Sequence, residues 1–145
     1  MEKLLEIKNL TKLFQVGYKK NITAINSISF DIFRGETFGL IGESGSGKST
    51  VGRCILNLIP PTDGKIYYKG IEYTQADRSQ KKQIRKEMQM VFQDPNYSLN
   101  PRVTVWDTIY NTLKVHKEYT NEQCLEMAKE ALDLVRLKES DYNKY

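Results

Sequence analysis

The fold of this chain is decided by one glycine-rich stretch, Gly42-Glu43-Ser44-Gly45-Ser46-Gly47-Lys48-Ser49-Thr50. It fits the pattern G-x-x-x-x-G-K-S/T, a loop whose successive backbone N–H groups converge on phosphate oxygens. Glycine permits the backbone angles and the close approach that such a loop needs. The pattern predicts that Lys48 lies between the β- and γ-phosphates of a nucleotide and that the Ser49 hydroxyl binds Mg²⁺. The alternative is an ordinary Gly/Ser turn with a solvated lysine.

Both flanks of this stretch have the character that the motif requires. Residues 37–41 are mostly apolar without alternation, which is typical of a strand covered on both faces in a parallel sheet. After the loop, four apolar residues recur at helical spacing: Val51, Cys54, Ile55 and Leu58. We expect Pro60-Pro61 to end that helix, because proline lacks an amide donor and clashes with the preceding turn. The glycine spacing does not fit G-x-G-x-x-G, so a dinucleotide-binding fold is not supported.

Other apolar patterns predict further strands. Alternation with period 2 predicts strands through residues 5–7 and 28–32, separated by a polar loop at residues 15–21. A short strand is expected at residues 65–69. The apolar segment at residues 88–92 is expected to form another strand.

Polar signals predict the remaining helices. Residues 77–87 are charged and are expected to be helical. Thr104 with Asp107, and Thr120 with Gln123, have the spacing of capping boxes. Each pair therefore predicts the start of a helix.

Length and composition bound the class of protein. The chain has 145 residues, 39% of them hydrophobic and 28% charged, which is typical of one soluble globular domain. The net charge is +4, and we interpret the basic residues 78–86 as a solvated helix face rather than a nucleic-acid patch. No apolar run approaches the about 18 residues of a membrane span. Cys54 and Cys124 have no metal-ligand spacing and are expected to be free thiols.

The flanks of the loop resemble the ATP-binding subunits of ABC transporters. The resemblance rests on residues 27–32 and 35–50, and on Met90-Val91-Phe92-Gln93-Asp94-Pro95, which is similar to the glutamine loop of that family. Ser98-Leu99-Asn100-Pro101-Arg102 is similar to the branch of oligopeptide and dipeptide importers and their nickel-importing relatives. The resemblance implies the α/β fold of a P-loop NTPase of the ABC type. Its parts would be an N-terminal antiparallel β part, an incomplete parallel-sheet core and the start of a helical subdomain.

The resemblance also implies how ATP and Mg²⁺ are bound. Residues 42–50 would hold the nucleotide, and Phe14 matches the aromatic residue that stacks on adenine, with Tyr18 as the substitute. Ser49 and Gln93 would be the Mg²⁺ ligands. Gln93 would also contact the attacking water.

A catalytic role and a set of partners follow from the same resemblance. Lys48 and Gln93 would be the catalytic residues of ATP hydrolysis, which would drive the uptake of oligopeptides or dipeptides. The region Asp94–Arg102 would receive two membrane-spanning importer subunits. The other implied partners are a second ATPase subunit and, indirectly, an extracytoplasmic solute-binding protein. The implied location is cytoplasmic, peripheral on the inner face of the cell membrane.

Three motifs of the family have no counterpart in the sequence: the Leu-Ser-Gly-Gly-Gln signature, a strand ending in Asp-Glu, and the switch histidine. His116 matches no such position, and we interpret it as a surface residue. We therefore expect residues 1–145 to be a partial nucleotide-binding domain that is impaired in hydrolysis alone. Its core would span about residues 1–92, and the glutamine loop and helical region about 93–145. The alternatives are a non-catalytic nucleotide-binding fragment or another P-loop enzyme, such as a GTPase, for whose Asn-Lys-x-Asp motif Asn143-Lys144 is the nearest match.

Overall fold

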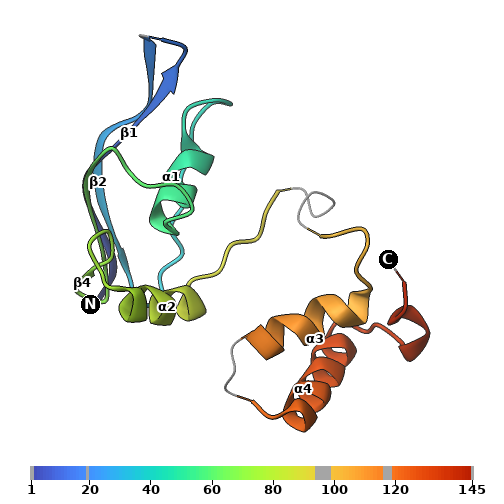
Figure 1. Ribbon diagram of the computed structural model, residues 1–145. Helices are drawn as coiled ribbons and strands as arrows, with labels where there is room; N and C mark the ends of the chain where they lie inside the picture. Colours follow the sequence, from blue (N-terminus) through green and yellow to red (C-terminus); the bar gives the residue numbers. More distant parts are fainter. Residues whose placement is uncertain (1, 19, 94–98, 116–118, 145) are drawn as a thin grey trace. The chain divides into compact units, whose positions relative to one another are not determined.

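The computed structural model describes residues 2–18, 20–93, 99–115 and 119–144. The chain divides into two compact units, Met1–Met90 and Val91–Tyr145. In the described residues, the first unit carries a β-sheet and helices (Figure 1). The second unit is helical in its described residues.

The first unit is built on a four-stranded antiparallel sheet with the strand order β2-β1-β3-β4. The strands are β1 (Lys3–Val16), β2 (Lys20–Phe33), β3 (Asp63–Tyr68) and β4 (Ile71–Glu72). β1 and β2 form a long hairpin in which Phe14 pairs with Ile22. On its other side β1 pairs with β3, and Ile7 lies opposite Ile66. The strands predicted through residues 5–7 and 28–32 are thereby confirmed.

Alternation along β1 turns one of its faces toward the core. Leu5 and Ile7 are buried on this face. At Asn9 the backbone has φ 50°, and the register between β1 and β2 shifts between Ile7 and Leu10. Such an irregularity moves the alternation by one residue, which is why Leu10 is fully buried.

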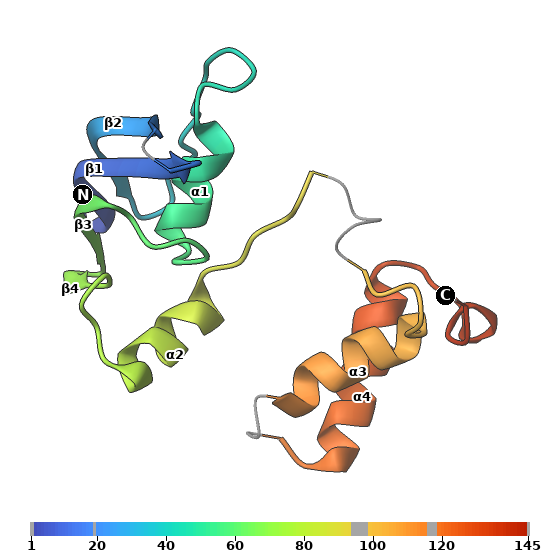
Figure 2. The same ribbon diagram turned by 45° about the horizontal axis from the view of Figure 1, so that its top comes forward.

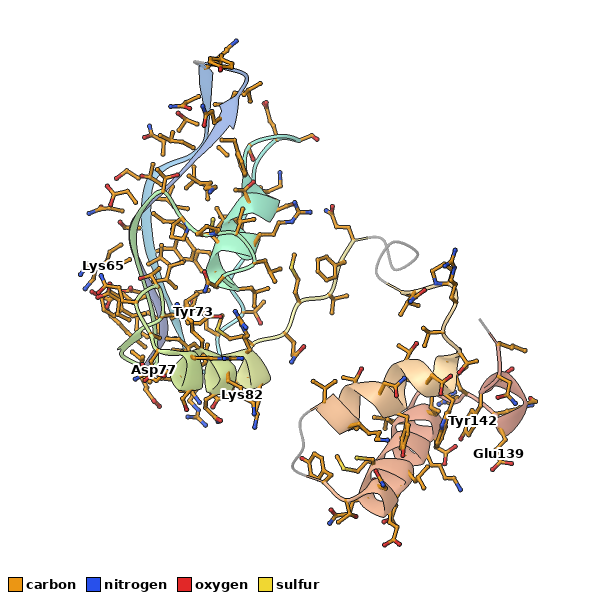
Figure 3. The ribbon with its side chains drawn as sticks, in the orientation of Figure 1. Lys65, Tyr73, Asp77, Lys82, Glu139 and Tyr142 are labelled. Carbon is orange, nitrogen blue, oxygen red and sulfur yellow. The ribbon has the colours of Figure 1, made fainter. Side chains whose placement is uncertain are left out.

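Two helices complete the core of this unit. α1 (Lys48–Ile55) covers one face of the sheet and buries Val51 and Cys54 there (Figure 2). α2 (Arg78–Glu87) contributes Ile84 to the same core. Its predicted helical character is confirmed, and it starts at a capping box. Tyr73 lies between the sheet and the helices (Figure 3), and its hydroxyl donates to the Leu56 carbonyl at 3.3 Å.

The end of α2 is tied to the sheet through Glu87. Its carboxylate accepts hydrogen bonds from the Tyr68 hydroxyl at 3.0 Å and from the Gln83 amide at 3.2 Å, and it forms an ion pair with Lys69. These contacts, the Lys69 bond first, lower the pKa of Glu87 below its ordinary value. The helix is thus anchored to the turn between β3 and β4 at one carboxylate.

Glu87→Gln is expected to lower the free energy of unfolding of the first unit at pH 7, compared with the wild type at the same pH. At pH 3 the difference between the two proteins should be smaller. Because the pKa of Glu87 is lower in the folded state, its contribution is present above the unfolded pKa of about 4.3 and is lost as the pH falls through the folded value. Urea unfolding midpoints of both proteins at the two pH values measure this. A stability difference that does not change with pH would contradict the role of the charge.

Two predicted strands are not formed. Residues 37–41 and 88–92 have no strand conformation, and the sheet of the described residues contains only β1 to β4. A strand is held by hydrogen bonds to a neighbouring strand, and neither segment has such a partner there. Within residues 37–41, the ring of Phe38 stacks on Phe30 of β2 with the ring centres 4.8 Å apart.

Two predicted boundaries are also wrong. α1 ends at Ile55 and not at Pro60-Pro61, because Asn57 turns into the left-handed region with φ 52°. Leu58 consequently leaves the helical stripe and is exposed. The polar loop expected at residues 15–21 is shorter, because β1 extends to Val16 and β2 begins at Lys20.

The second unit is a helical pair. Its elements are α3 (Val105–Val115), α4 (Asn121–Leu134) and η2 (Glu139–Asp141). Thr104 and Thr120 accept hydrogen bonds from the backbone of Asp107 and Gln123, so both predicted helix starts are confirmed.

An aromatic stack joins the start of α3 to the last described residues. Trp106 is half-buried and stacks on Tyr110 at 5.9 Å and on Tyr142 at 5.3 Å. The Trp106 amide also donates to the Tyr142 carbonyl at 3.0 Å.

Among the residues that the structure describes, no helix is both long and apolar enough to span a membrane.

Candidate nucleotide-binding site

The end of the phosphate loop packs against strand β2. Gly47 precedes α1 with φ 96°, in the left-handed region. A Cβ atom at this position would lie 2.2 Å from the carbonyl oxygen of Ala24. Gly45 also has a positive φ of 81°, but a Cβ there would meet nothing within 4 Å. Glycine is therefore required at Gly47 for two reasons, the backbone angle and the contact with β2.

The Lys48 side chain folds back over the loop. Its ammonium donates to the carbonyl oxygens of Gly42 at 2.7 Å and Glu43 at 2.5 Å, and lies 3.4 Å from the Ser46 hydroxyl oxygen. All of these acceptors are uncharged, so they orient the ammonium without neutralising it. The positive charge at the start of α1 adds to that of the helix N-terminus, and both favour a phosphate group.

A cavity of about 300 Å³ lies beside the loop. Its lining includes Ala24 and Asn26 from β2, and Gly42, Ser46 and Lys48 from the loop and α1. Among the described residues of this lining, Lys48 has the one charged side chain. Most of the other lining side chains are apolar, so the Lys48 ammonium is what favours an anionic group here.

The next two residues carry hydroxyl groups on the first turn of α1. Ser49 is exposed and Thr50 is half-buried. Within the described ranges, no three His, Cys, Asp or Glu side chains gather to hold a metal ion. Mg²⁺ in nucleotide sites takes few protein ligands and completes its shell with phosphates and water. The Ser49 hydroxyl fits that limited role.

The aromatic residue expected to stack on adenine lies in the same unit as the loop. Phe14 is 40% exposed and pairs with Ile22, two residues along β2 from the Ala24 carbonyl that Gly47 approaches. Two residues of a strand span about 7 Å. Tyr18 is 99% exposed beside Gly17, at the turn of the hairpin. Along the hairpin, Phe14 therefore lies nearer than Tyr18 to the point where Gly47 approaches β2.

The expected glutamine loop belongs, from Val91 onward, to the second unit. Gln93 is exposed and lies in the unit Val91–Tyr145. The flanking Asp94 and Pro95 lie outside the described residues, as does His116. The chain turns near Arg102, whose backbone amide donates a hydrogen bond to the Asn100 side-chain oxygen at 3.0 Å.

Fold and site together define the chain as a phosphate-loop protein of the α/β class. Residues 25–145 match the ABC transporter family. The chain belongs to this family, and the resemblance inferred from the loop and its flanks is confirmed.

Similar proteins share this assignment. The chain is 45% identical to the oligopeptide transport ATP-binding protein OppF of Bacillus subtilis, over 99% of this chain and 48% of OppF. It is 40% identical to the putative oligopeptide transport ATP-binding protein YkfD of the same organism, over 92% of this chain and 41% of YkfD. The chain thus spans about half the length of these relatives.

A solved structure supports the fold. The ATP-binding cassette MJ0796, in a dimeric post-hydrolysis state bound to ADP and Pi, is similar with a TM-score of 0.80 and 30% identity. The similarity covers 97% of this chain and 60% of that chain. The expected fold class, an ABC-type P-loop NTPase, is confirmed, but the expected parallel-sheet core is not formed in the described residues, whose sheet is antiparallel throughout.

Sequence reasoning missed the contribution of β2 to the site. Ala24 and Asn26 line the cavity, and the Ala24 backbone abuts Gly47. The sequence could not indicate the contact between Ala24 and Gly47, because a backbone carbonyl oxygen makes it and every residue type has one.

Proposed function

We propose that this chain binds Mg-ATP at residues 42–50 and is part of an ATP-binding subunit that powers the import of peptides. The observation that carries ATP binding is the Lys48 ammonium, held by uncharged loop carbonyls at the N-terminus of α1. Peptide import is supported by the 45% identity to a protein named for oligopeptide transport.

Each residue has a distinct task in this proposal. The loop amides and Lys48 bind the phosphates and bring the γ-phosphate to a defined position. Ser49 and Gln93 would be the residues that hold Mg²⁺, and the ion would supply positive charge for the phosphate oxygens. Gln93 orients the attacking water, so it acts with Lys48 in hydrolysis. Phe14 stacks on adenine and selects for a nucleotide over free polyphosphate.

The proposal includes partners and a location. A second ATPase subunit pairs with the chain, and two membrane-spanning subunits dock on the region Asp94–Arg102, of which residues 94–98 lie outside the described part. A solute-binding protein takes part indirectly, and the whole works at the cytoplasmic face of the membrane. Support comes from the names of the relatives and from the dimeric state of MJ0796. Residues 1–92 would form the core part and residues 93–145 the helical part.

Mg-ATP is expected to raise the melting temperature of the chain by several degrees. At about 100 times its Kd, a ligand that binds only the folded state stabilises it by about 2.7 kcal/mol, which shifts the melting temperature of a small domain measurably. A thermal shift series with Mg-ATP, Mg-GTP and Mg²⁺ alone measures this.

The outcomes separate the candidate functions. A shift with Mg-ATP that exceeds the shift with Mg-GTP supports the proposal. Equal shifts with both nucleotides would favour another P-loop enzyme, and no shift with either would overturn nucleotide binding. Phosphate release above that of Lys48→Ala separates an ATPase from a non-catalytic binding fragment.

A further inference from the structure

Strand β1 is fastened to the segment that follows α1. The Thr62 amide donates to the Thr11 carbonyl at 2.8 Å, and the Leu13 amide donates to the Thr62 hydroxyl at 2.9 Å. Between these two bonds, the Lys12 ammonium donates to the Pro60 carbonyl at 2.7 Å. The Lys12 side chain is therefore tethered at its charged end.

The same ammonium lies over an aromatic ring. Lys12 Nζ is 5.2 Å from the centre of the Phe14 ring, within the range of a cation–π contact. One lysine thus connects the Phe14 ring with the chain that leaves α1.

We infer that Lys12 is a positioning residue for the base of the nucleotide, because it holds the Phe14 ring in a fixed orientation. This inference rests on the proposed function, in which Phe14 stacks on adenine. The ammonium occupies one face of the ring, and the ring remains 40% exposed for a second contact.

The physical reason is preorganisation. A side chain that is already ordered loses less conformational entropy when a ligand stacks on it. Lys12 is itself ordered by the Pro60 carbonyl, so the ring is braced against the segment after α1 and not against a free lysine. Lys12 is assigned no contact with the phosphates, and this distinguishes it from Lys48.

The experiment compares two ligands that share the phosphates and differ in the base. Calorimetric titration of the 145-residue chain with Mg-ATP and with Mg-tripolyphosphate gives the ratio of the two Kd values. The variants are Lys12→Met, which keeps the aliphatic stem, and Lys12→Arg, which keeps the charge. For Lys12→Met we expect the preference for ATP over tripolyphosphate to fall roughly two- to fivefold. Tripolyphosphate affinity should stay unchanged, and Lys12→Arg should restore the preference.

Several results would overturn the inference. One is a preference for ATP over tripolyphosphate that is unchanged in Lys12→Met, even if the melting temperature of that variant is lower. Another is an equal loss of affinity for both ligands, which would mean that Lys12 acts on the phosphates. A wild-type chain that binds both ligands equally would remove the role of the base. A wild-type chain that binds neither ligand would overturn the proposed function, and this inference with it.

Discussion

Lys48→Ala is expected to lower the affinity for Mg-ATP by about tenfold to a hundredfold, which corresponds to the loss of a charge-assisted hydrogen bond of about 1.5–3 kcal/mol. The ammonium is already directed over the loop by the carbonyls of Gly42 and Glu43, so little ordering is needed when phosphate binds. Equilibrium titration with Mg-ATP at fixed salt measures the loss. Salt must be fixed because screening weakens charge interactions at the surface.

Lys82→Ala is the matched control for this prediction. It removes the same charge from the same unit, at an exposed position on α2 (Figure 3). We expect this variant to bind Mg-ATP like the wild type, because Lys82 does not line the cavity beside the loop. An equal loss in both variants would mean that net charge, and not the position of Lys48, determines the affinity.

Gly47→Ala is expected to destabilise the first unit by about 3 kcal/mol or more, and to abolish Mg-ATP binding where the protein still folds. The left-handed backbone angle alone costs a non-glycine residue about 1–2 kcal/mol. The new Cβ would also lie 2.2 Å from the Ala24 carbonyl oxygen, so the loop and β2 must move apart. Urea unfolding followed by circular dichroism measures the free energy of unfolding.

Gly45→Ala is the control that separates the two costs. Gly45 has a φ of 81°, but its added Cβ would meet no atom within 4 Å. We expect this variant to lose only the backbone part, about 1–2 kcal/mol. Similar losses in the two variants would show that the contact with Ala24 is not what requires glycine at position 47.

The starts of α3 and α4 could be predicted from residues that are close together in the sequence. Thr104 and Thr120 were predicted to cap helices because Asp107 and Gln123 follow them at the spacing of a capping box. In the structure, each threonine hydroxyl accepts a hydrogen bond from the backbone amide of that later residue. A capping box involves only neighbouring residues, so its sequence pattern is sufficient.

The strands at residues 37–41 and 88–92 show where such signals fail. Their apolar composition is correct for a buried strand, yet neither segment has a hydrogen-bonded neighbour in the described residues. A strand is a property of two segments, and the pattern of one segment contains no information about its partner. The helix boundary at Ile55 was also missed, because Asn57 takes a positive φ that its residue type permits but does not require.

The family of this chain could be predicted from its sequence alone, and the residues of the proposed phosphate loop could be named from it, because one continuous stretch, residues 42–50, carries the glycines, the lysine and the hydroxyl groups. The parts of the chain that surround this loop could not be predicted in this way, because they are brought to it by folding. The fit of Gly47 against Ala24 and the bracing of Phe14 by Lys12 both depend on the register of β1 and β2 and on the path of the chain after α1. Those contacts join residues far apart in the sequence, and they form only when the sheet and α1 pack together.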